Sequence, residues 1–101
     1  MLDAVAGANE DVRKAVIWYE DQRAGLGDKF FQELSRAMDR IAANPRRFGR
    51  LDRCPTSDDI RLCRMKRFPY LIYFRLQGTE ILVLAVGHSS RKPLYWLDRL
   101  S

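Results

Sequence analysis

Residues 64–96 read RMKRFPYLIYFRLQGTEILVLAVGHSSRKPLYW, and this stretch decides the fold. Its residues 70–76 are rich in aromatic and β-branched side chains, which suit a pleated strand, and Gln77-Gly78 supplies a turn. The chain then returns through residues 81–86, which are apolar at every position. Such a run is typical of a central strand whose two faces are both covered. The stretch therefore predicts a β-hairpin within a small sheet.

Two helices are predicted before this sheet, because apolar residues recur there at spacings of three and four. The first apolar stripe consists of Ala8, Val12, Ala15, Val16 and Tyr19. The polar residues Asn9, Glu10 and Asp11 near its start favour a helix N-terminus. The second consists of Phe30, Phe31, Leu34, Ala37, Met38, Ile41 and Ala42. Gly25-Leu26-Gly27 is expected to end the first helix, Asp28 to cap the second, and Asn44-Pro45 to end it.

The two ends of the chain add smaller elements. A short last helix is predicted to begin at Pro93, where the missing N–H costs nothing, and to carry Leu94, Tyr95, Trp96, Leu97 and Leu100. Residues 1–5 give only a weak signal for one more strand at the sheet edge. The predicted fold class is therefore α+β, with an N-terminal helical hairpin packed on a small twisted antiparallel sheet and followed by a short C-terminal helix.

The length of 101 residues predicts one domain, residues 1–101, around one core. The sequence has neither an apolar run long enough to cross a bilayer nor a secretion signal, so a cytoplasmic protein without membrane contact is expected. Cys54 and Cys63, with a single histidine, cannot form a four-ligand zinc site by themselves. We expect reduced thiols, no metal and no cofactor.

Charge is unevenly distributed along the chain. Residues 1–44 hold six Lys and Arg against eight Asp and Glu, whereas residues 45–101 hold twelve against five. The basic residues of the second part include Arg46, Arg47, Arg50, Arg53, Arg61, Arg64, Lys66, Arg67, Arg91 and Lys92. This excess predicts an anionic partner, which is either nucleic acid or an acidic protein segment.

The basic cluster, the C-terminal aromatic residues and the single histidine each also have a simpler, structural interpretation. The basic cluster at residues 61–67 can be a solvated surface that only keeps the protein soluble. In an ideal strand its basic side chains would lie on both faces, which gives only weak support for a binding surface. Tyr95 and Trp96 are more often anchors of a terminal helix than contacts to a substrate. His88, at the end of an apolar strand, is more often a structural hydrogen-bonding residue than a general base.

Four separated segments resemble the RelE/ParE superfamily of toxins from type II toxin–antitoxin systems. They read AVIWYEDQRAGLGDKFFQEL, IAANPRRF, KRFPYLIYF and LAVGHSSRKPLYW, and they occur in order over nearly the whole chain. The ParE-like branch, often labelled plasmid stabilisation proteins, is the most similar. The resemblance implies a helical hairpin on a twisted antiparallel sheet, which agrees with the elements predicted above.

The resemblance further implies a toxin that arrests growth and is neutralised by a cognate antitoxin with an acidic tail, as a homodimer or a toxin–antitoxin hetero-oligomer. A ParE-like toxin poisons DNA gyrase without a nuclease site, and the ending His88-x-x-Arg91-x-Pro93 followed by Trp96 favours this target. The residues expected to bind the target or the antitoxin are Arg61, Arg64, Lys66, Arg67, His88, Arg91, Lys92 and Trp96.

A RelE-like toxin, the alternative, is a metal-independent endoribonuclease that cleaves mRNA on the ribosome. The residues that would then supply charge and protons are Arg64, Lys66, Arg67, Arg91 and Tyr95. Ser89 stands where the RelE-like site has an arginine, and a hydroxyl cannot stabilise phosphate charge as a guanidinium does. A third hypothesis is an inactive module that binds the antitoxin or nucleic acid and represses its own operon, but the predicted helices carry no helix-turn-helix pattern.

Overall fold

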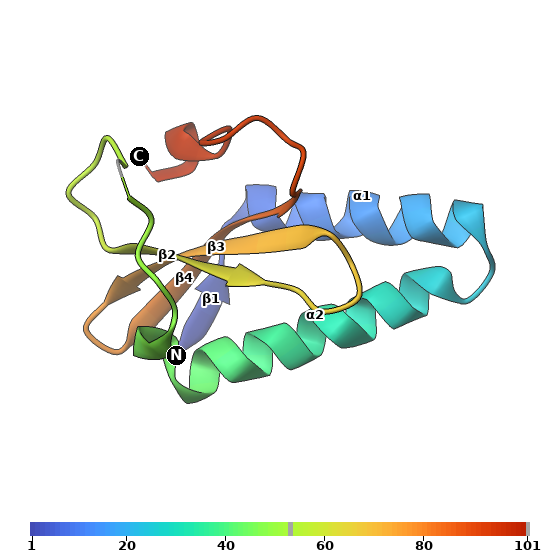
Figure 1. The fold of residues 1–101 in the computed structure, drawn as a ribbon, viewed down its shortest axis with the longest axis horizontal. Coiled ribbons are helices and arrows are strands. Elements are labelled where there is room, and N and C mark those ends of the chain that lie inside the picture. The colour runs from blue at the N-terminus through green and yellow to red at the C-terminus, as the bar shows by residue number, and fades with distance from the viewer. Residues whose placement is uncertain (53, 101) are drawn as a thin grey trace.

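The computed structural model describes residues 1–52 and 54–100 (Figure 1). Its elements are β1 (Leu2–Ala4), α1 (Ala6–Gln22), α2 (Leu26–Ala43), the 3₁₀ turn η1 (Pro45–Arg47), β2 (Ile60–Arg64), β3 (Tyr70–Gln77), β4 (Glu80–His88) and the 3₁₀ turn η2 (Leu97–Leu100). The two long helices run antiparallel, and the connection between them lies at the end of the molecule away from the sheet. No helix in this described part is long and apolar enough to span a bilayer.

The sheet has the order β1-β4-β3-β2, which places β4 between two strands and leaves β1 and β2 at the edges. The β3–β4 hairpin is confirmed, with Gly78 at a positive φ of 60° in the turn between Gln77 and Glu80. The weak signal for a strand at residues 1–5 is also confirmed. However, β1 pairs with β4 in parallel, so the sheet is mixed and the expectation of an antiparallel sheet was wrong for this edge.

The connection between the helices differs in detail from the expectation. Gly25 adopts a φ of 88°, but α2 begins at Leu26, so Asp28 lies inside the first turn and is not its cap. The cap comes from α1 instead, where the Glu20 carboxylate accepts hydrogen bonds from the backbone N–H groups of Gly25 and Gly27 at 2.9–3.1 Å. A Cβ on Gly27 would lie 2.8 Å from the carbonyl oxygen of Val16, so glycine permits the close approach of the helices.

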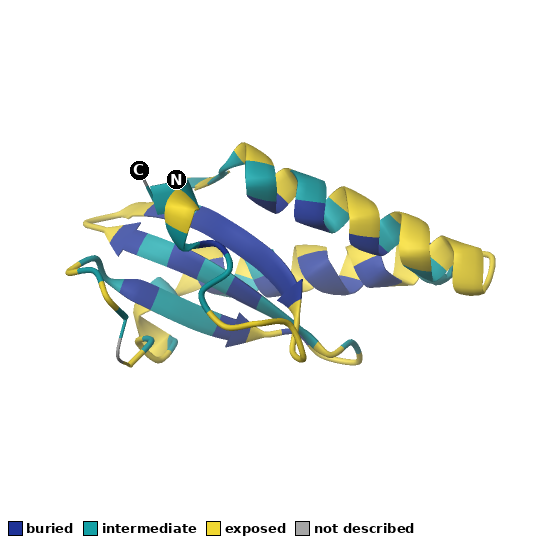
Figure 2. Ribbon diagram, turned by 90° about the horizontal axis from the view of Figure 1, so that it is seen from above, coloured by how far each residue is buried: buried dark blue, intermediate teal, exposed yellow. Residues whose placement is uncertain are grey.

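The core has two parts, one on each face of the sheet, and Figure 2 shows β4 buried along most of its length. The helices cover one face, where Phe30, Ile41 and Phe74 are fully buried. The chain after β4, residues 89–100, is called the C-terminal segment, and it covers the other face through Trp96. The prediction of a central strand covered on both sides is therefore confirmed. A bulge in the β3–β4 register leaves Leu84 without a partner on β3.

Three further expectations were wrong. The basic cluster at residues 61–67 was expected on one strand, but β2 ends at Arg64, so Lys66 and Arg67 lie in the following loop, where Arg67 has a positive φ of 69°. Residues 93–96 form turns, and the expected C-terminal helix is reduced to η2. Phe31, half exposed at 53%, and Ala42 lie on the outer side of α2. Arg53, counted with the basic cluster, lies outside the described residues.

Candidate functional site

A groove of about 360 Å³ lies between α1, the end of β4 and the C-terminal segment. Its lining combines aromatic, basic and acidic side chains with two glycines. The lining residues are Gly7, Glu10, Asp11, Lys14, Ala15, Trp18, Tyr70, Val86, Gly87, His88, Arg91 and Arg99. Two of the residues expected from the sequence, His88 and Arg91, therefore share one site with residues of α1 that are about 70 to 80 positions away in the chain.

Asp11 is the centre of the polar contacts at this groove. Its side chain is only 7% exposed, and it accepts hydrogen bonds from the Val86 backbone N–H at 3.0 Å and from the Tyr95 hydroxyl at 3.2 Å. Arg99 binds both carboxylate oxygens, at 2.8 and 3.2 Å. A buried carboxylate needs such partners, because desolvation of its charge is costly.

The contacts of Asp11 follow from the shortness of β1. The backbone N–H of Val5 donates the last hydrogen bond from this edge of the sheet to β4, to the carbonyl oxygen of Val83, and α1 begins at the next residue. Beyond this point β4 has polar backbone groups that no strand pairs. Asp11 accepts from the Val86 N–H, and Arg99 donates to the Leu84 carbonyl oxygen at 3.0 Å. This ion pair therefore takes the place of a strand along β4.

Arg91 and Arg99 are the lining residues that follow β4, and Tyr95 packs against Arg91. The Arg91 guanidinium carbon lies 3.7 Å from the centre of the Tyr95 ring, in a close cation–π contact. Its Nη1 lies 3.9 Å from Asp11 Oδ1, and half of the side chain is exposed. Tyr95 packs against Gly87, where a Cβ would lie 2.9 Å from the ring carbon Cε1. Glycine at position 87 is thus what allows Tyr95 to reach Asp11.

The environment of Tyr95 changes its acidity. Burial, followed by the negative charge of Asp11, raises the pKa of the Tyr95 phenol far above its usual value of 10.0. The phenol therefore remains protonated at neutral pH and is a weaker acid than an exposed tyrosine. Because its hydroxyl already donates to Asp11, its proton is also engaged in a structural bond.

The opposite wall of the groove is aromatic. Trp18 of α1 is 56% exposed, and Tyr70 of β3 contacts the ring of His88 with a centroid distance of 5.5 Å. His88 Nδ1 accepts from the backbone N–H of Ser90 at 3.0 Å and lies 2.7 Å from its hydroxyl oxygen. His88 thus fixes the turn that follows β4, as the structural interpretation of this residue predicted, while its ring borders the groove.

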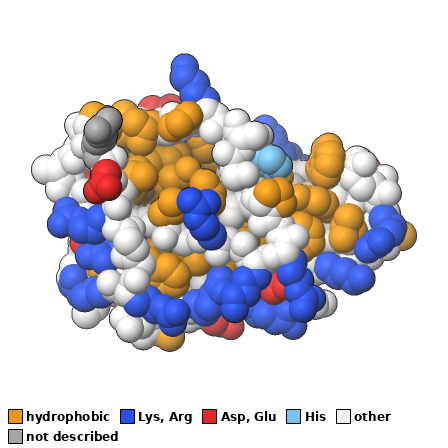
Figure 3. Space-filling model, viewed as in Figure 1, with side chains coloured by type: hydrophobic (Ala, Val, Ile, Leu, Met, Phe, Trp, Pro, Cys, Tyr) orange, Lys and Arg blue, Asp and Glu red, His pale blue; other side chains and the backbone are white. Residues whose placement is uncertain are grey.

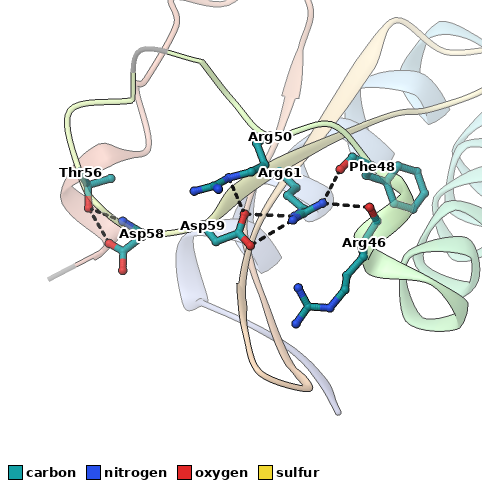
Figure 4. Close-up of polar contacts among 7 residues, drawn as sticks. All are labelled: Arg46, Phe48, Arg50, Thr56, Asp58, Asp59 and Arg61. Carbon is teal, nitrogen blue, oxygen red and sulfur yellow. Dashed lines mark hydrogen bonds and ion pairs between the residues drawn. The ribbon is translucent and has the colours of Figure 1, made fainter.

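The structure gives Arg61 a structural role, although it was expected to bind a target. Its side chain is only 12% exposed and pairs with Asp59 at 3.1 Å. Its Nη1 donates to the carbonyl oxygens of Arg46 and Phe48 at 3.0 and 2.8 Å, which ties the segment after η1 to β2 (Figure 4). Arg50 pairs with the same Asp59 carboxylate at 3.2 Å.

The other bases of this cluster lie at or beyond the end of β2. Arg64, Lys66 and Arg67 are all exposed, and Arg67 also pairs with the buried Glu33 of α2 at 3.3 Å. Arg64 lies opposite Leu71, which lies opposite Gly87 on β4, so these bases and the groove are at the same end of the sheet. Figure 3 shows a row of Lys and Arg side chains along the lower part of this face of the molecule. Lys92 is exposed beside Arg91.

Trp96 is fully buried and lies 5.2 Å from Tyr73, measured between ring centroids. It anchors the C-terminal segment to the sheet and cannot contact a partner in this structure, so the simpler interpretation of this residue is confirmed. Conversely, sequence reasoning did not identify Asp11, Arg99 or Trp18 as site residues. Asp11 had been interpreted only as a residue favouring the start of a helix, although a polar residue between Ala8 and Ala15 at spacings of three and four was a signal that it faces inward.

Comparison with known proteins agrees with this fold. The family model described as the ParE toxin of the type II toxin–antitoxin system parDE matches residues 6–93. A solved structure, "Chromosomal ParDE TA system from P. aeruginosa", is similar with a TM-score of 0.74 and 20% sequence identity, over 86% of this chain and 92% of that one. No curated protein sequence matches. Since the family model spans most of the chain, including both long helices and strands β2, β3 and β4, the chain belongs to the ParE toxin family of type II toxin–antitoxin systems.

Proposed function

We propose that this toxin arrests growth by inhibiting DNA gyrase, that it does so without cutting nucleic acid, and that a cognate antitoxin neutralises it. The observation that carries the proposal is the state of Tyr95, the candidate proton donor of a nuclease. Its hydroxyl is bound to Asp11, its ring lies under Arg91, and its pKa is raised by burial. A general acid should instead have a pKa near the working pH and a proton free to reach the leaving group.

Two further observations support a non-catalytic toxin. Ser89, at the position of an expected catalytic arginine, is an exposed residue that cannot stabilise a pentacovalent phosphate. Arg61, one of the basic residues expected to meet a target, is only 12% exposed and is engaged by Asp59, whereas Arg67 pairs with Glu33 but remains 80% exposed. Gyrase inhibition requires only a binding surface, and Arg64, Lys66, Arg91 and Lys92 remain exposed for it at one end of the sheet.

The alternative is RNA cleavage on the ribosome, and one observation favours it. The half-exposed Arg91 is adjacent to Tyr95, and the exposed Arg64 and Lys66 lie at the same end of the sheet. This arrangement offers positive charge to a phosphate, although the hydroxyl of Tyr95 is engaged by Asp11. The two functions differ in what the Tyr95 hydroxyl should contribute, and this difference provides the test.

The test is expression of the toxin without an antitoxin in cells that carry a DNA-damage reporter, with growth recorded in parallel. We expect growth arrest with strong reporter induction for the wild type and for Tyr95→Phe, because this substitution removes one hydroxyl and little packing. Arrest with a silent reporter, abolished by Tyr95→Phe while the variant still folds, would support the ribonuclease. Absence of arrest by folded wild-type protein would leave the inactive antitoxin-binding module.

A further inference from the structure

One side of α2 carries a row of basic side chains, although this helix belongs to the part of the chain with an acidic excess. An α-helix turns by about 100° per residue, so Lys29, Arg36 and Arg40 lie within about 40° of one another around the axis. The acidic Asp28 and Asp39 lie about 80–100° away from Lys29 around the same axis. The helix rises about 17 Å between Lys29 and Arg40. The three cations therefore form a straight row that is not interrupted by these two acids.

The loop after β2 adds a further cation to this row. Glu33 lies on the same side of α2, is only 8% exposed, and pairs with Arg36 at 3.1 Å and with Arg67 at 3.3 Å. The two arginine side chains nevertheless remain 65% and 80% exposed. Because a guanidinium has five N–H donors, one contact with a carboxylate leaves donors for an external anion. Glu33 thus holds two cations next to each other without hiding them from solvent.

The row continues past the end of α2 to η1. Arg40 is held at the end of β2, where its Nη2 lies 3.4 Å from the carbonyl oxygen of Arg64 and 3.8 Å from Cys63 Sγ. Burial raises the pKa of the Cys63 thiol, and the nearby charges of Arg40 and Arg47 oppose this rise. The exposed Arg47 is therefore close to the same point. We call the whole row the α2 edge, and its members are Lys29, Arg36, Arg40, Arg47 and Arg67. In Figure 3 basic side chains follow the lower part of the molecule, where Figure 1 places α2.

The α2 edge offers charge but little apolar surface to a partner. The large apolar side chains that are exposed in residues 1–52 and 54–100 are Met1, Ile17, Trp18 and Phe31. None of them belongs to this row, since Phe31 lies about 160° from Lys29 around the axis of α2. The centre of a protein–protein interface is apolar and depleted of charge, whereas protein–DNA interfaces are polar and strongly positive. The composition of the α2 edge therefore favours nucleic acid over an acidic protein.

The aromatic residues beside the α2 edge decide between single-stranded and double-stranded nucleic acid. Proteins bind single strands by stacking the bases on accessible aromatic rings. A hollow of about 260 Å³ that includes Lys29, Arg36 and Arg67 has one ring in its lining, that of Phe68. This ring packs against Tyr19 and Phe30 at centroid distances of 4.9 and 5.2 Å, so it is engaged within the core. A duplex instead presents phosphates to a straight row of cations and needs no stacking platform.

We infer that the α2 edge binds the phosphate backbone of double-stranded DNA without sequence preference. Guanidinium groups pair well with phosphate oxygens, and contacts to phosphates carry no sequence information. Glu33 is the positioning residue that holds Arg36 and Arg67 toward the duplex. The inference goes beyond the proposed inhibition of gyrase, because it assigns to the toxin a direct contact with DNA. Its test therefore contains no gyrase, and failure of one proposal leaves the other intact.

The test measures binding of the full-length toxin to a fluorescent DNA duplex of about 20 base pairs, by anisotropy, between about 50 and 200 mM salt. Four to five phosphate contacts predict a slope of about −4 for the logarithm of the binding constant against the logarithm of salt concentration. Two duplexes of unrelated sequence should bind equally. Lys29→Gln with Arg36→Gln should reduce the slope by about 2 and weaken binding by about tenfold or more. The matched control, Arg13→Gln with Arg23→Gln, removes the same charge from exposed positions in and after α1 and should bind within about twofold of the wild type.

A single variant guards against a folding defect in the double variant. Lys29→Gln leaves both ion pairs of Glu33 in place and should still weaken binding several-fold. Equal weakening by the two double variants, an affinity that does not change with salt, or tighter binding of a single strand would each overturn the inference. In ¹⁵N NMR spectra the duplex should shift backbone signals of residues 29–40, and shifts confined to the Trp18 indole would place DNA in the groove instead. Competition by polyglutamate as strong as that by unlabelled duplex would assign the α2 edge to an acidic protein.

Discussion

Asp11 shows how one buried charge can organise two distant parts of the chain. It lies in α1, while its partners Val86 and Arg99 are 75 and 88 positions away. The ion pair with Arg99 raises the pKa of that guanidinium, mainly through the hydrogen bond to the carboxylate. Replacement of the carboxylate would leave Arg99, whose side chain is 21% exposed, without its main counter-ion. Asp11 is thus expected to stabilise the fold and the groove together.

We predict that Asp11→Asn lowers the free energy of unfolding by about 3 kcal/mol, because removal of one partner leaves the other charge largely buried and uncompensated. Urea denaturation followed by circular dichroism measures this change. Asp21→Asn is the matched control, since Asp21 is exposed on the same helix, and it should change stability by less than about 0.5 kcal/mol. Similar effects of the two substitutions would refute the role assigned to Asp11.

The raised pKa of Tyr95 predicts a loss of stability in alkaline solution. Above pH 10 the unfolded chain releases the phenolic proton, whereas the folded protein retains it, so the unfolded state is favoured as pH rises. Burial raises the pKa of Tyr70 and Tyr73 in the same direction. Tyr95→Phe should therefore reduce the alkaline decline without removing it. Urea unfolding between about pH 8 and 11 measures the difference, and parallel wild-type and variant curves would contradict the assignment.

At the scale of elements, the helices and the hairpin could be predicted because their signals are local. The apolar periodicity of α1 and α2, the glycines between them and the apolar run of β4 each lie within one short window of sequence. The parallel pairing of β1 and the path of residues 93–100 could not be predicted in this way. Both depend on contacts with β4 and with Asp11, and three-residue elements have little intrinsic preference.

The C-terminal segment is held by the bonds of Tyr95 and Arg99 to Asp11 and by one large apolar anchor. Trp96 is fully buried, and its segment covers the second face of the sheet. We predict that Trp96→Ala lowers the free energy of unfolding by about 4 kcal/mol through the lost burial and the cavity. Thermal unfolding followed by circular dichroism measures this loss of stability, because its signal does not depend on the fluorescence of the tryptophan that is removed. Pro93→Ala, an exposed position in the same segment, is the control and should have a small effect.

At the scale of the whole molecule, residues 45–101 carry an excess of basic over acidic side chains, and several of these bases are bound within the fold. Some arginines of residues 45–101 form ion pairs within the fold, as Arg61 does with Asp59 and Arg99 with Asp11. Composition therefore overestimated the basic surface that is available to an anionic partner. One group of exposed bases, Arg64, Lys66, Arg67, Arg91 and Lys92, lies at the end of the sheet that contains the groove, whereas Arg46, Arg47 and Arg50 are exposed around η1. Composition identified the sign of the partner's charge, but only the fold shows which bases remain available.

Purified components can test whether this toxin inhibits DNA gyrase by binding alone. DNA gyrase is incubated with relaxed plasmid, ATP and the toxin, and both supercoiling and protein-linked DNA breaks are measured on gels. We expect dose-dependent loss of supercoiling with accumulation of breaks, unchanged by Tyr95→Phe and weakened by the double variant Arg64→Gln with Lys66→Gln. Unaffected supercoiling, together with cleavage of mRNA on ribosomes by the same preparation, would contradict it.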